Sequence, residues 1–493
     1  MSKKQEIFVL ALIMLAAVFL SSYCLKTSPA FWFDEGIFYQ VVNNLAVNGQ
    51  LGLPLSPTTS SDLSLISMGY PIFLPAVLAF KIFGSGVIVI RMVAIAFLLG
   101  FFIVAFFLAK KLYGLRVALA TMLLLVTFSP LYGNGKSFLG EVPGLFFFLT
   151  GLFILTILEQ SKIKRIYLAF LGGIFFGFAV SAKPIFILIL PALAAGLAVQ
   201  WRNFLASRQD RRITIALLVG LGFAVNVWVW TQFDLSTTSI SSVFGHFVNP
   251  NHLDKTAPAI FVNLLRFFTE STPMFFLLQL CLAVYYFFYC FKRRIHISAT
   301  KTIIFTFAFL IFAAYLRNVG WYRYFFPGQV MVYFFMIPGL LAIETKIKNS
   351  KYYGRYFVPI VFSAILVVQI LPLSKNALTC IIDAPTAIEP YLKSLDEHSP
   401  VLFYSLPQLA ARYEGSAAYQ YIKMNKTVIL GEDNLDLLNQ DFFSRIFIEE
   451  NDMVGKEQLP SCFKLDQTIR GIDIYRRDLQ ISCKATTSSE SNI

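Results

Sequence analysis

The chain has 493 residues, of which 57% are hydrophobic and 14% charged, and its mean hydropathy is +0.67. A soluble chain carries about 25% charged residues, so this composition excludes a soluble enzyme, a disordered protein and a disulfide scaffold. The net charge of +13 divides unevenly, with +18 on residues 1–373 and −5 on residues 374–493. The sequence therefore predicts a polytopic α-helical membrane domain over 1–373 and a separate domain over 374–493, and nothing in it demands a nucleic-acid partner.

A helix that crosses a bilayer needs about 20 mostly apolar residues. Runs without Asp, Glu, Lys or Arg predict eleven such helices, at 7–25, 92–109, 117–135, 142–158, 166–182, 184–201, 213–233, 271–291, 302–316, 324–343 and 356–374. With the N-terminus in the cytoplasm, 20 of the 29 basic residues of 1–373 fall in cytoplasmic segments, as the positive-inside rule requires. The predicted location is the plasma (inner) membrane, with the first span uncleaved and the C-terminal domain outside.

The first outer loop, residues 26–70, contains an acidic pair, Asp34 and Glu35, directly after an aromatic run. Apolar residues then recur at helical spacing until Asn48-Gly49, which predicts a helix that begins at the pair. A carboxylate fixed there is able to accept a proton from a hydroxyl as a general base, or else the two acids only cap the helix. The following apolar segment, 71–83, is too short to span and predicts an interfacial helix on the outer face.

Further charged residues fall on the outer side near membrane depth: Glu141, Lys183, Arg91, Arg317 and Arg323. Ionisable groups at this depth usually face a cavity or a partner. Alternatively, Glu141 is a solvated acid in a loop. The cationic side chains then extend to the lipid phosphates. Together they predict a site that binds an anion beside carboxylates that take a proton. A lipid-linked phosphate donor and a hydroxyl acceptor fit that combination.

Residues 374–493 have short apolar runs at 401–404, 427–430, 445–448 and 471–475, with helix-like stretches at 406–421 and 435–443. This alternation predicts a small α/β domain, followed by a disordered tail over 485–493. Cys24, Cys281 and Cys290 fall in or beside spans, where they are interpreted as small apolar residues. Cys380, Cys462 and Cys483 lie outside, and a Cys462–Cys483 disulfide is an open alternative.

Several motifs, taken in order over residues 1 to about 345, resemble those of the GT-C superfamily of integral-membrane glycosyltransferases. They are WFDEGIFYQ after the first span, Phe83-Gly84 with Arg91, Glu141, the Lys183 turn, and RYFFP with Arg323, Tyr324 and Pro327. The resemblance is to the branch of protein O-mannosyltransferases and lipid A aminoarabinose transferases. It departs from the latter at SMGYP (67–71), where those enzymes place a Lys-Pro, and in having Glu rather than Asp as the second acid.

The resemblance implies transfer of a sugar from a polyprenyl-phosphate carrier to a lipid, glycan or protein acceptor on the outer face, usually with inversion. It implies Asp34 as the base, with Glu35 its neighbour and Glu141 a second acid. Arg323 and Lys183 would hold the carrier phosphate, and Tyr324 would hydrogen-bond the sugar or phosphate.

Two other functions stay open at this point, a transporter or flippase of lipid-linked sugars and a non-catalytic scaffold for the outer domain. A transporter more often shows internal repeats, and none is evident here. No metal site is assigned, although the three acids are oxygen ligands of the kind that Mg²⁺ or Mn²⁺ accepts.

Overall fold

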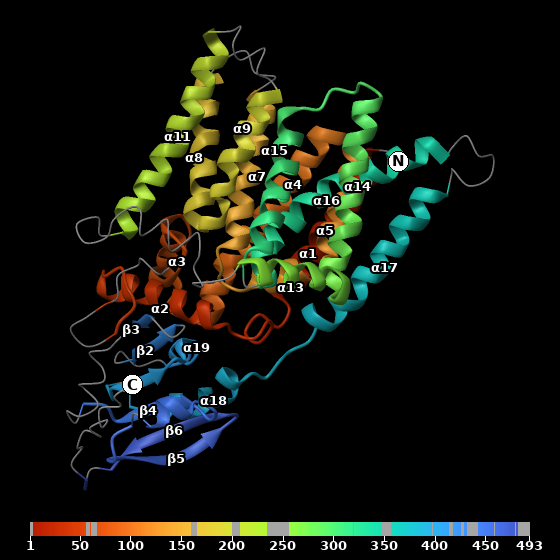
Figure 1. The fold of residues 1–493 in the computed structure, drawn as a ribbon. Coiled ribbons are helices and arrows are strands. Elements are labelled where there is room, and N and C mark those ends of the chain that lie inside the picture. Colours follow the sequence, from red (N-terminus) through yellow and green to blue (C-terminus); the bar gives the residue numbers. More distant parts are fainter. Residues whose placement is uncertain are drawn as a thin grey trace. The chain divides into compact units, whose positions relative to one another are not determined.

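The computed structural model describes residues 3–55, 60, 67–158, 165–199, 208–233, 256–318, 320–347, 356–396, 398–413, 418–424, 428–430, 442–457, 459–478 and 480–481. The chain forms two compact units (Figure 1). Unit 1 comprises residues 1–23, 67–72 and 94–379, and unit 2 comprises residues 24–66, 73–93 and 380–493. The boundary at 379/380 lies close to the predicted one, but the first loop up to residue 66 belongs with the C-terminal residues rather than with the membrane domain.

Most of unit 1 is helical, and its long helices are strongly apolar. Nine described helices are long and apolar enough to span a membrane: α1 (Lys3–Ser22), α4 (Val87–Tyr113), α7 (Glu141–Leu158), α8 (Arg165–Ala182), α11 (Arg208–Gln232), α14 (Ser271–Lys292), α15 (Ala299–Leu316), α16 (Tyr322–Ile347) and α17 (Phe357–Ala377). The pair α5 (Leu115–Val126) and α6 (Pro130–Lys136), bent by 70°, makes up to ten. The prediction of a multi-pass helical membrane protein is confirmed.

The predicted span at 184–201 differs most from the structure. It consists of a 3-10 turn, η1 (Pro184–Leu188), and a short helix, α9 (Ile189–Val199). Proline at the start favours a tight turn, so the apolar run does not form one long helix. A 14-residue helix at 256–269, α13 (Thr256–Thr269), was not predicted. The short helix predicted at 71–83 is present as α3 (Tyr70–Phe83).

The most buried span is α16, which packs against α5, α7, α14, α15 and α17. Polar side chains on it bond to one another and to α14: the Tyr322 hydroxyl donates to Gln329 Oε1 (2.6 Å), and Gln329 Nε2 donates to Gln279 Oε1 of α14 (3.1 Å). Such bonds satisfy polar groups that lipid cannot solvate. They fix the N-terminal turn of α16, which carries Arg323 and Tyr324.

Unit 2 contains a six-stranded mixed sheet in the order β3-β2-β1-β4-β6-β5. Its strands are β1 (Val401–Tyr404), β2 (Ala418–Met424), β3 (Val428–Leu430), β4 (Arg445–Glu449), β5 (Phe463–Ile469) and β6 (Ile472–Arg477). β1 pairs in parallel with β2 and β4. Its side chains alternate between two apolar clusters, one with Val401 and Phe403 and the other with Leu402 and Tyr404, so both faces of the sheet are buried.

The α/β domain is thus confirmed, with helices α18 (Ala384–Lys393), α19 (Pro407–Ala410) and α21 (Met453–Glu457). All four predicted strands are present, as β1, β3, β4 and β6. The predicted helix over 406–421 corresponds to α19 only over 407–410, and the prediction is wrong at 418–421, where the alternating aromatic residues Tyr419 and Tyr421 lie in β2. β5 was not predicted. The helix predicted at 435–443 falls largely outside the described residues, as does the tail.

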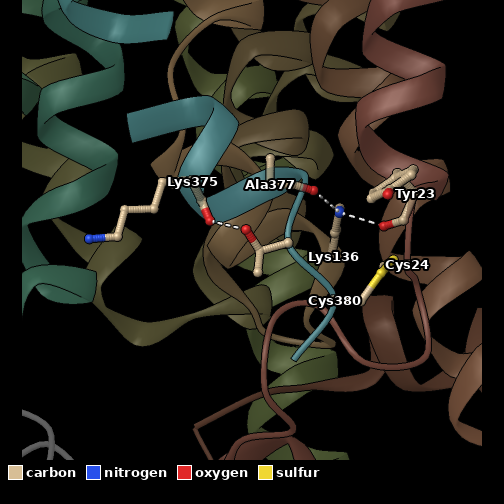
Figure 2. Close-up of a disulfide and its surroundings, with 7 residues drawn as sticks. Tyr23, Cys24, Lys136, Lys375, Ala377 and Cys380 are labelled. Atoms are coloured by element: carbon tan, nitrogen blue, oxygen red, sulfur yellow. Dashed lines mark hydrogen bonds between the residues drawn. A yellow bond between two sulfur atoms is a disulfide. The ribbon is translucent and has the colours of Figure 1, made fainter. Parts of the chain in front are cut away.

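A disulfide joins Cys24 to Cys380 within unit 2, with a Cα–Cα distance of 5.5 Å (Figure 2). The interpretation of Cys24 as a small apolar residue is therefore wrong. Cys462 is also disulfide-bonded, whereas its predicted partner, Cys483, lies outside the described residues. Within unit 1, Lys136 Nζ donates to the carbonyl oxygens of Tyr23 (2.9 Å) and Ala377 (3.3 Å). Lys136 therefore holds the residue after α1 and the last residue of α17, close to the points where the chain leaves unit 1.

Candidate active site

The predicted helix after the first span is present as α2 (Phe33–Asn48), and it ends at Gly49 in the left-handed conformation (φ 70°). Asp34 and Glu35 lie in its first turn, as predicted. Their surroundings differ, because Asp34 is half-buried whereas Glu35 is fully buried. Two neighbouring acids of the same motif are therefore placed for different roles.

Glu35 and Arg91 form a buried, bidentate ion pair. Arg91 Nε and one terminal nitrogen each donate to a Glu35 carboxylate oxygen at 2.8 Å, and both side chains are 0% exposed. The other terminal nitrogen of Arg91 donates to the carbonyl oxygens of Leu25 and Pro29 (2.9 and 3.0 Å). Arg91 thus connects the start of α4 to α2 and to the loop that precedes it.

A second cluster in unit 2 centres on Glu389 of α18. Its carboxylate accepts from Lys26 Nζ (2.8 Å) and from Arg412 (3.1 Å), and Lys393 lies 3.4 Å away. Burial opposes ionisation of Glu389. The Lys26 hydrogen bond and the three positive charges outweigh that burial, and they hold the pKa of the carboxyl below its ordinary value of 4.5. The charged form is therefore the one that the folded unit favours.

Acidification is expected to destabilise unit 2 in part through Glu389. Because the folded pKa is lowered, its contribution is complete above the ordinary value of 4.5 and is lost as pH falls through the folded pKa. The thermal unfolding midpoint, followed against pH in the wild type and in Glu389→Gln, checks this. The variant should lose less stability over that range, and parallel curves would contradict the assignment.

In unit 1, Lys183 and Glu141 lie together, as the sequence predicted for a joint site. Lys183 Nζ is 3.5 Å from Glu141 Oε1, and the two side chains are 5% and 1% exposed. Lys183 Nζ also donates to Ser67 Oγ at 2.8 Å. Neither Glu141 oxygen accepts a hydrogen bond from the described residues. Glu141 is therefore a buried carboxylate balanced by one ammonium, with acceptor capacity to spare.

The residue before Glu141 explains how the two segments approach so closely. A Cβ on Gly140 would lie 2.3 Å from the carbonyl oxygen of Ala182 and 3.1 Å from Lys183 Cδ. Only glycine leaves the turn before α7 enough room to pack on the Ala182-Lys183 backbone. The Glu141–Lys183 distance is therefore set by the backbone on both sides.

Arg323 and Tyr324 lie in the first turn of α16, and both are half-buried. The Arg323 guanidinium lies over the rings of Trp321 (4.9 Å) and Tyr324 (5.2 Å), which stack on each other. Cation–π contacts of this kind restrict where the guanidinium lies. Arg317, the C-cap of α15, is exposed.

The chain resembles known proteins in part of its sequence and in its fold. A family model described as dolichyl-phosphate-mannose-protein mannosyltransferase matches residues 71–230. The fold is similar to that of ArnT from Cupriavidus metallidurans bound to undecaprenyl phosphate, with a TM-score of 0.60 and 11% identity over 96% of this chain and 98% of that one. The chain has a GT-C fold. Its similarity also extends to the Archaeoglobus fulgidus oligosaccharyltransferase AglB in complex with an inhibitory peptide and a dolichol-phosphate, with a TM-score of 0.57 and 11% identity over 97% and 75% of the two chains. No curated protein matches in sequence.

The two compact units divide the predicted residues into two sets. Asp34, Glu35 and Arg91 belong to unit 2, and the rest belong to unit 1: Glu141, Lys183, Arg317, Arg323 and Tyr324. The prediction placed Arg91 at the donor phosphate, whereas in the structure its guanidinium binds Glu35 and two loop carbonyls.

Three residues that contact these sets or the segment between Arg317 and Arg323 were not predicted. Ser67 falls in the SMGYP segment, which the sequence marked only for lacking a lysine. Asn263 and Arg266 lie one turn apart on α13 and donate to carbonyl oxygens of the segment that joins α15 to α16, those of Asn318 (2.7 Å) and Gly320 respectively. The i, i+3 spacing of Asn263 and Arg266 within an apolar segment was the sequence signal that could have identified them.

A divalent cation was left open by the sequence. Across the described ranges, no three His, Cys, Asp or Glu side chains cluster closely enough to hold a metal ion. The two predicted glutamates contact cationic side chains instead, Glu35 with Arg91 and Glu141 with Lys183. Among the described residues, neither of these glutamates therefore fits a metal centre.

Proposed function

We propose that this protein transfers a sugar from a polyprenyl-phosphate carrier to a hydroxyl group of a lipid, glycan or protein acceptor. The observation that carries the proposal is the end-to-end likeness to ArnT in a complex with undecaprenyl phosphate, covering 96% of this chain. The AglB complex likewise contains a polyprenyl phosphate, dolichol-phosphate. A shared carrier across two relatives of this fold supports a lipid-linked donor here.

We place the reaction on the outer face of the plasma (inner) membrane. The Cys24–Cys380 disulfide supports this side for the loop after α1 and for the C-terminal domain, because disulfides persist in oxidising compartments. Lys3 and Lys4 at the start of α1 support the outer side independently for the loop after α1, since cytoplasmic segments attract Lys and Arg.

Asp34 is the proposed general base. It lies in the first turn of α2 and is half-buried. It accepts the proton of the acceptor hydroxyl as that oxygen attacks the anomeric carbon of the sugar. The new carbon–oxygen bond forms while the bond from the anomeric carbon to the carrier phosphate breaks. The electron pair leaves on the phosphate, which is released as polyprenyl phosphate.

The departing phosphate gains negative charge, so fixed cations lower the barrier. We assign this role to Lys183 and Arg323, with Arg317 at the exposed end of α15 and Tyr324 as a hydrogen-bond donor. The 3.5 Å contact of Lys183 with Glu141 supports the assignment, since Glu141 keeps a buried ammonium in place. The unfilled acceptor capacity of Glu141 suits a sugar hydroxyl.

We assign Glu35 and Arg91 to holding the loop and helix that carry Asp34 rather than to the chemistry. Their carboxylate and guanidinium are fully buried and bonded to each other. A carboxylate whose two oxygens both accept from one guanidinium is held in a fixed position by that pair.

Arg323→Ala is expected to weaken binding of a polyprenyl-phosphate sugar about 10- to 100-fold, since a hydrogen bond to a charged group contributes about 1.5–3 kcal/mol. Donor binding to purified protein in lipid, measured by isothermal titration, checks this. Lys375→Ala is the matched control, because Lys375 is an exposed cation at the end of α17. Unchanged affinity in Arg323→Ala would leave Arg323 with a structural role only.

A further inference from the structure

We infer that the C-terminal α/β domain sets the rate of transfer by holding the helix that carries Asp34. The inference rests on the proposed function in taking Asp34 as the base. It assigns the domain a positioning role through four of its ties, all within unit 2, to residues 24–40.

The closest tie joins α2 to α19. A Cβ on Gly36 would lie 2.5 Å from the backbone nitrogen of Gln408 and from the carbonyl carbon of Pro407. These are backbone atoms, so they cannot move aside as a flexible side chain would. The helix that begins beside Asp34 is therefore in backbone contact with the C-terminal domain only two residues after the base.

One turn further along, Gln40 repeats the contact on the same helix face. Its Nε2 donates to the carbonyl oxygen of Pro407 at 3.0 Å and to that of Gly36 at 3.2 Å. The side chain is buried, where a hydrogen bond is costly to lose. Gly36 and Gln40 together fix both the distance and the rotation of α2 against α19.

The position of α19 is in turn set by the sheet. It follows β1 directly, and Leu409 and Ala410 belong to the apolar cluster that contains Val401 and Phe403 of the central strand. A movement of the sheet core would therefore move α19 and, with it, the first turn of α2.

The loop before α2 has two further non-covalent ties to the same domain. The Phe31 backbone nitrogen donates to Asp383 Oδ2 at 2.8 Å, and Asp383 also caps α18 by accepting from the Thr386 nitrogen at 2.9 Å. Arg412 donates to the Lys26 carbonyl oxygen at 3.1 Å. The loop is thus bonded to the N-terminus of α18 and to the residues just after α19.

The fourth tie is covalent. Cys24 and Cys380 are the residues at which the chain enters unit 2 from α1 and from α17, and their disulfide joins the start of the loop to the start of the domain (Figure 2). A domain that only presented an acceptor would not need bonds at residues 24, 26, 31, 36 and 40. Because a misplacement of about 1 Å costs about 10²-fold in rate, these ties are expected to control turnover.

The test compares Gln40→Ala and Gly36→Ala with Asn43→Ala. Asn43 lies on α2 too but accepts from Ser85 Oγ (2.6 Å), away from α19. We expect kcat to fall about 10-fold in Gln40→Ala and about 100-fold in Gly36→Ala, with donor affinity within twofold of wild type. The double variant Cys24→Ser/Cys380→Ser should also lower kcat, whereas Cys281→Ser, which removes a free cysteine, should not.

Amide hydrogen exchange over residues 33–41 gives a second readout that does not depend on transfer. Faster exchange in Gln40→Ala than in Asn43→Ala, together with the loss of kcat, supports the inference. A kcat within twofold of Asn43→Ala in both Gln40→Ala and Gly36→Ala overturns it. If the wild type transfers no sugar, the proposed function fails separately. Exchange then decides alone, and equal exchange in Gln40→Ala and Asn43→Ala overturns the inference.

Discussion

Asp34→Asn is expected to lower the rate of sugar transfer by about 10²- to 10⁴-fold, the usual contribution of a positioned general base. The amide keeps the size and shape of the carboxylate but cannot accept a proton. Because Asp34 is half-buried and lies outside the Glu35–Arg91 pair, thermal stability should stay near that of the wild type. Initial rates with a polyprenyl-phosphate sugar, measured beside an unfolding curve, separate the two effects.

Asp34→Glu is the conservative partner of this experiment. It retains a carboxylate displaced by one methylene, so part of the activity should return. Transfer by Asp34→Asn at the wild-type rate would remove Asp34 from the chemistry, and with it the proposed reaction step.

Glu35→Gln and Arg91→Met are each expected to lower the free energy of unfolding of unit 2 by about 3–5 kcal/mol. Either change leaves a fully buried charge without its partner, which costs more than the pair itself contributes. Arg91→Met also removes the donors to the Leu25 and Pro29 carbonyls. Denaturant unfolding in lipid or detergent, followed by intrinsic fluorescence, measures the loss.

The double variant Glu35→Leu/Arg91→Met should be more stable than either single variant, because no unpaired charge remains buried. If Glu35→Gln instead unfolds like the wild type and loses only activity, Glu35 acts in the chemistry and the scaffold role assigned to it is wrong.

Local patterns in the sequence predicted most of the helices. The α2 helix was predicted with its acidic first turn and its end at Asn48-Gly49, because helical spacing and a C-cap glycine are short-range signals. The apolar run at 184–201 was wrongly predicted to be one long helix, because hydropathy measures the length of an apolar run but does not detect the turn that begins at Pro184. The helix α13 was missed because Asn263 and Arg266 interrupt its apolar run.

The candidate site was predicted less completely, for a physical reason. The sequence marks Glu141 and Lys183 as charged residues beside apolar segments, and the structure puts their charged groups 3.5 Å apart. The pairing of Glu35 with Arg91 joins residues 56 apart, and the disulfide joins residues 356 apart. No periodicity relates such positions in a single sequence. That the first loop belongs with the C-terminal domain follows only from these long-range bonds.

The most direct test of the proposed function follows donor and acceptor together, in proteoliposomes supplied with a polyprenyl-phosphate sugar and a hydroxyl-bearing acceptor. Mass analysis should show one new glycosidic bond on the acceptor for each polyprenyl phosphate released, with almost none in Asp34→Asn. Donor that crosses the bilayer with its sugar still attached, and no glycosylated acceptor, would contradict the proposal and identify a flippase instead.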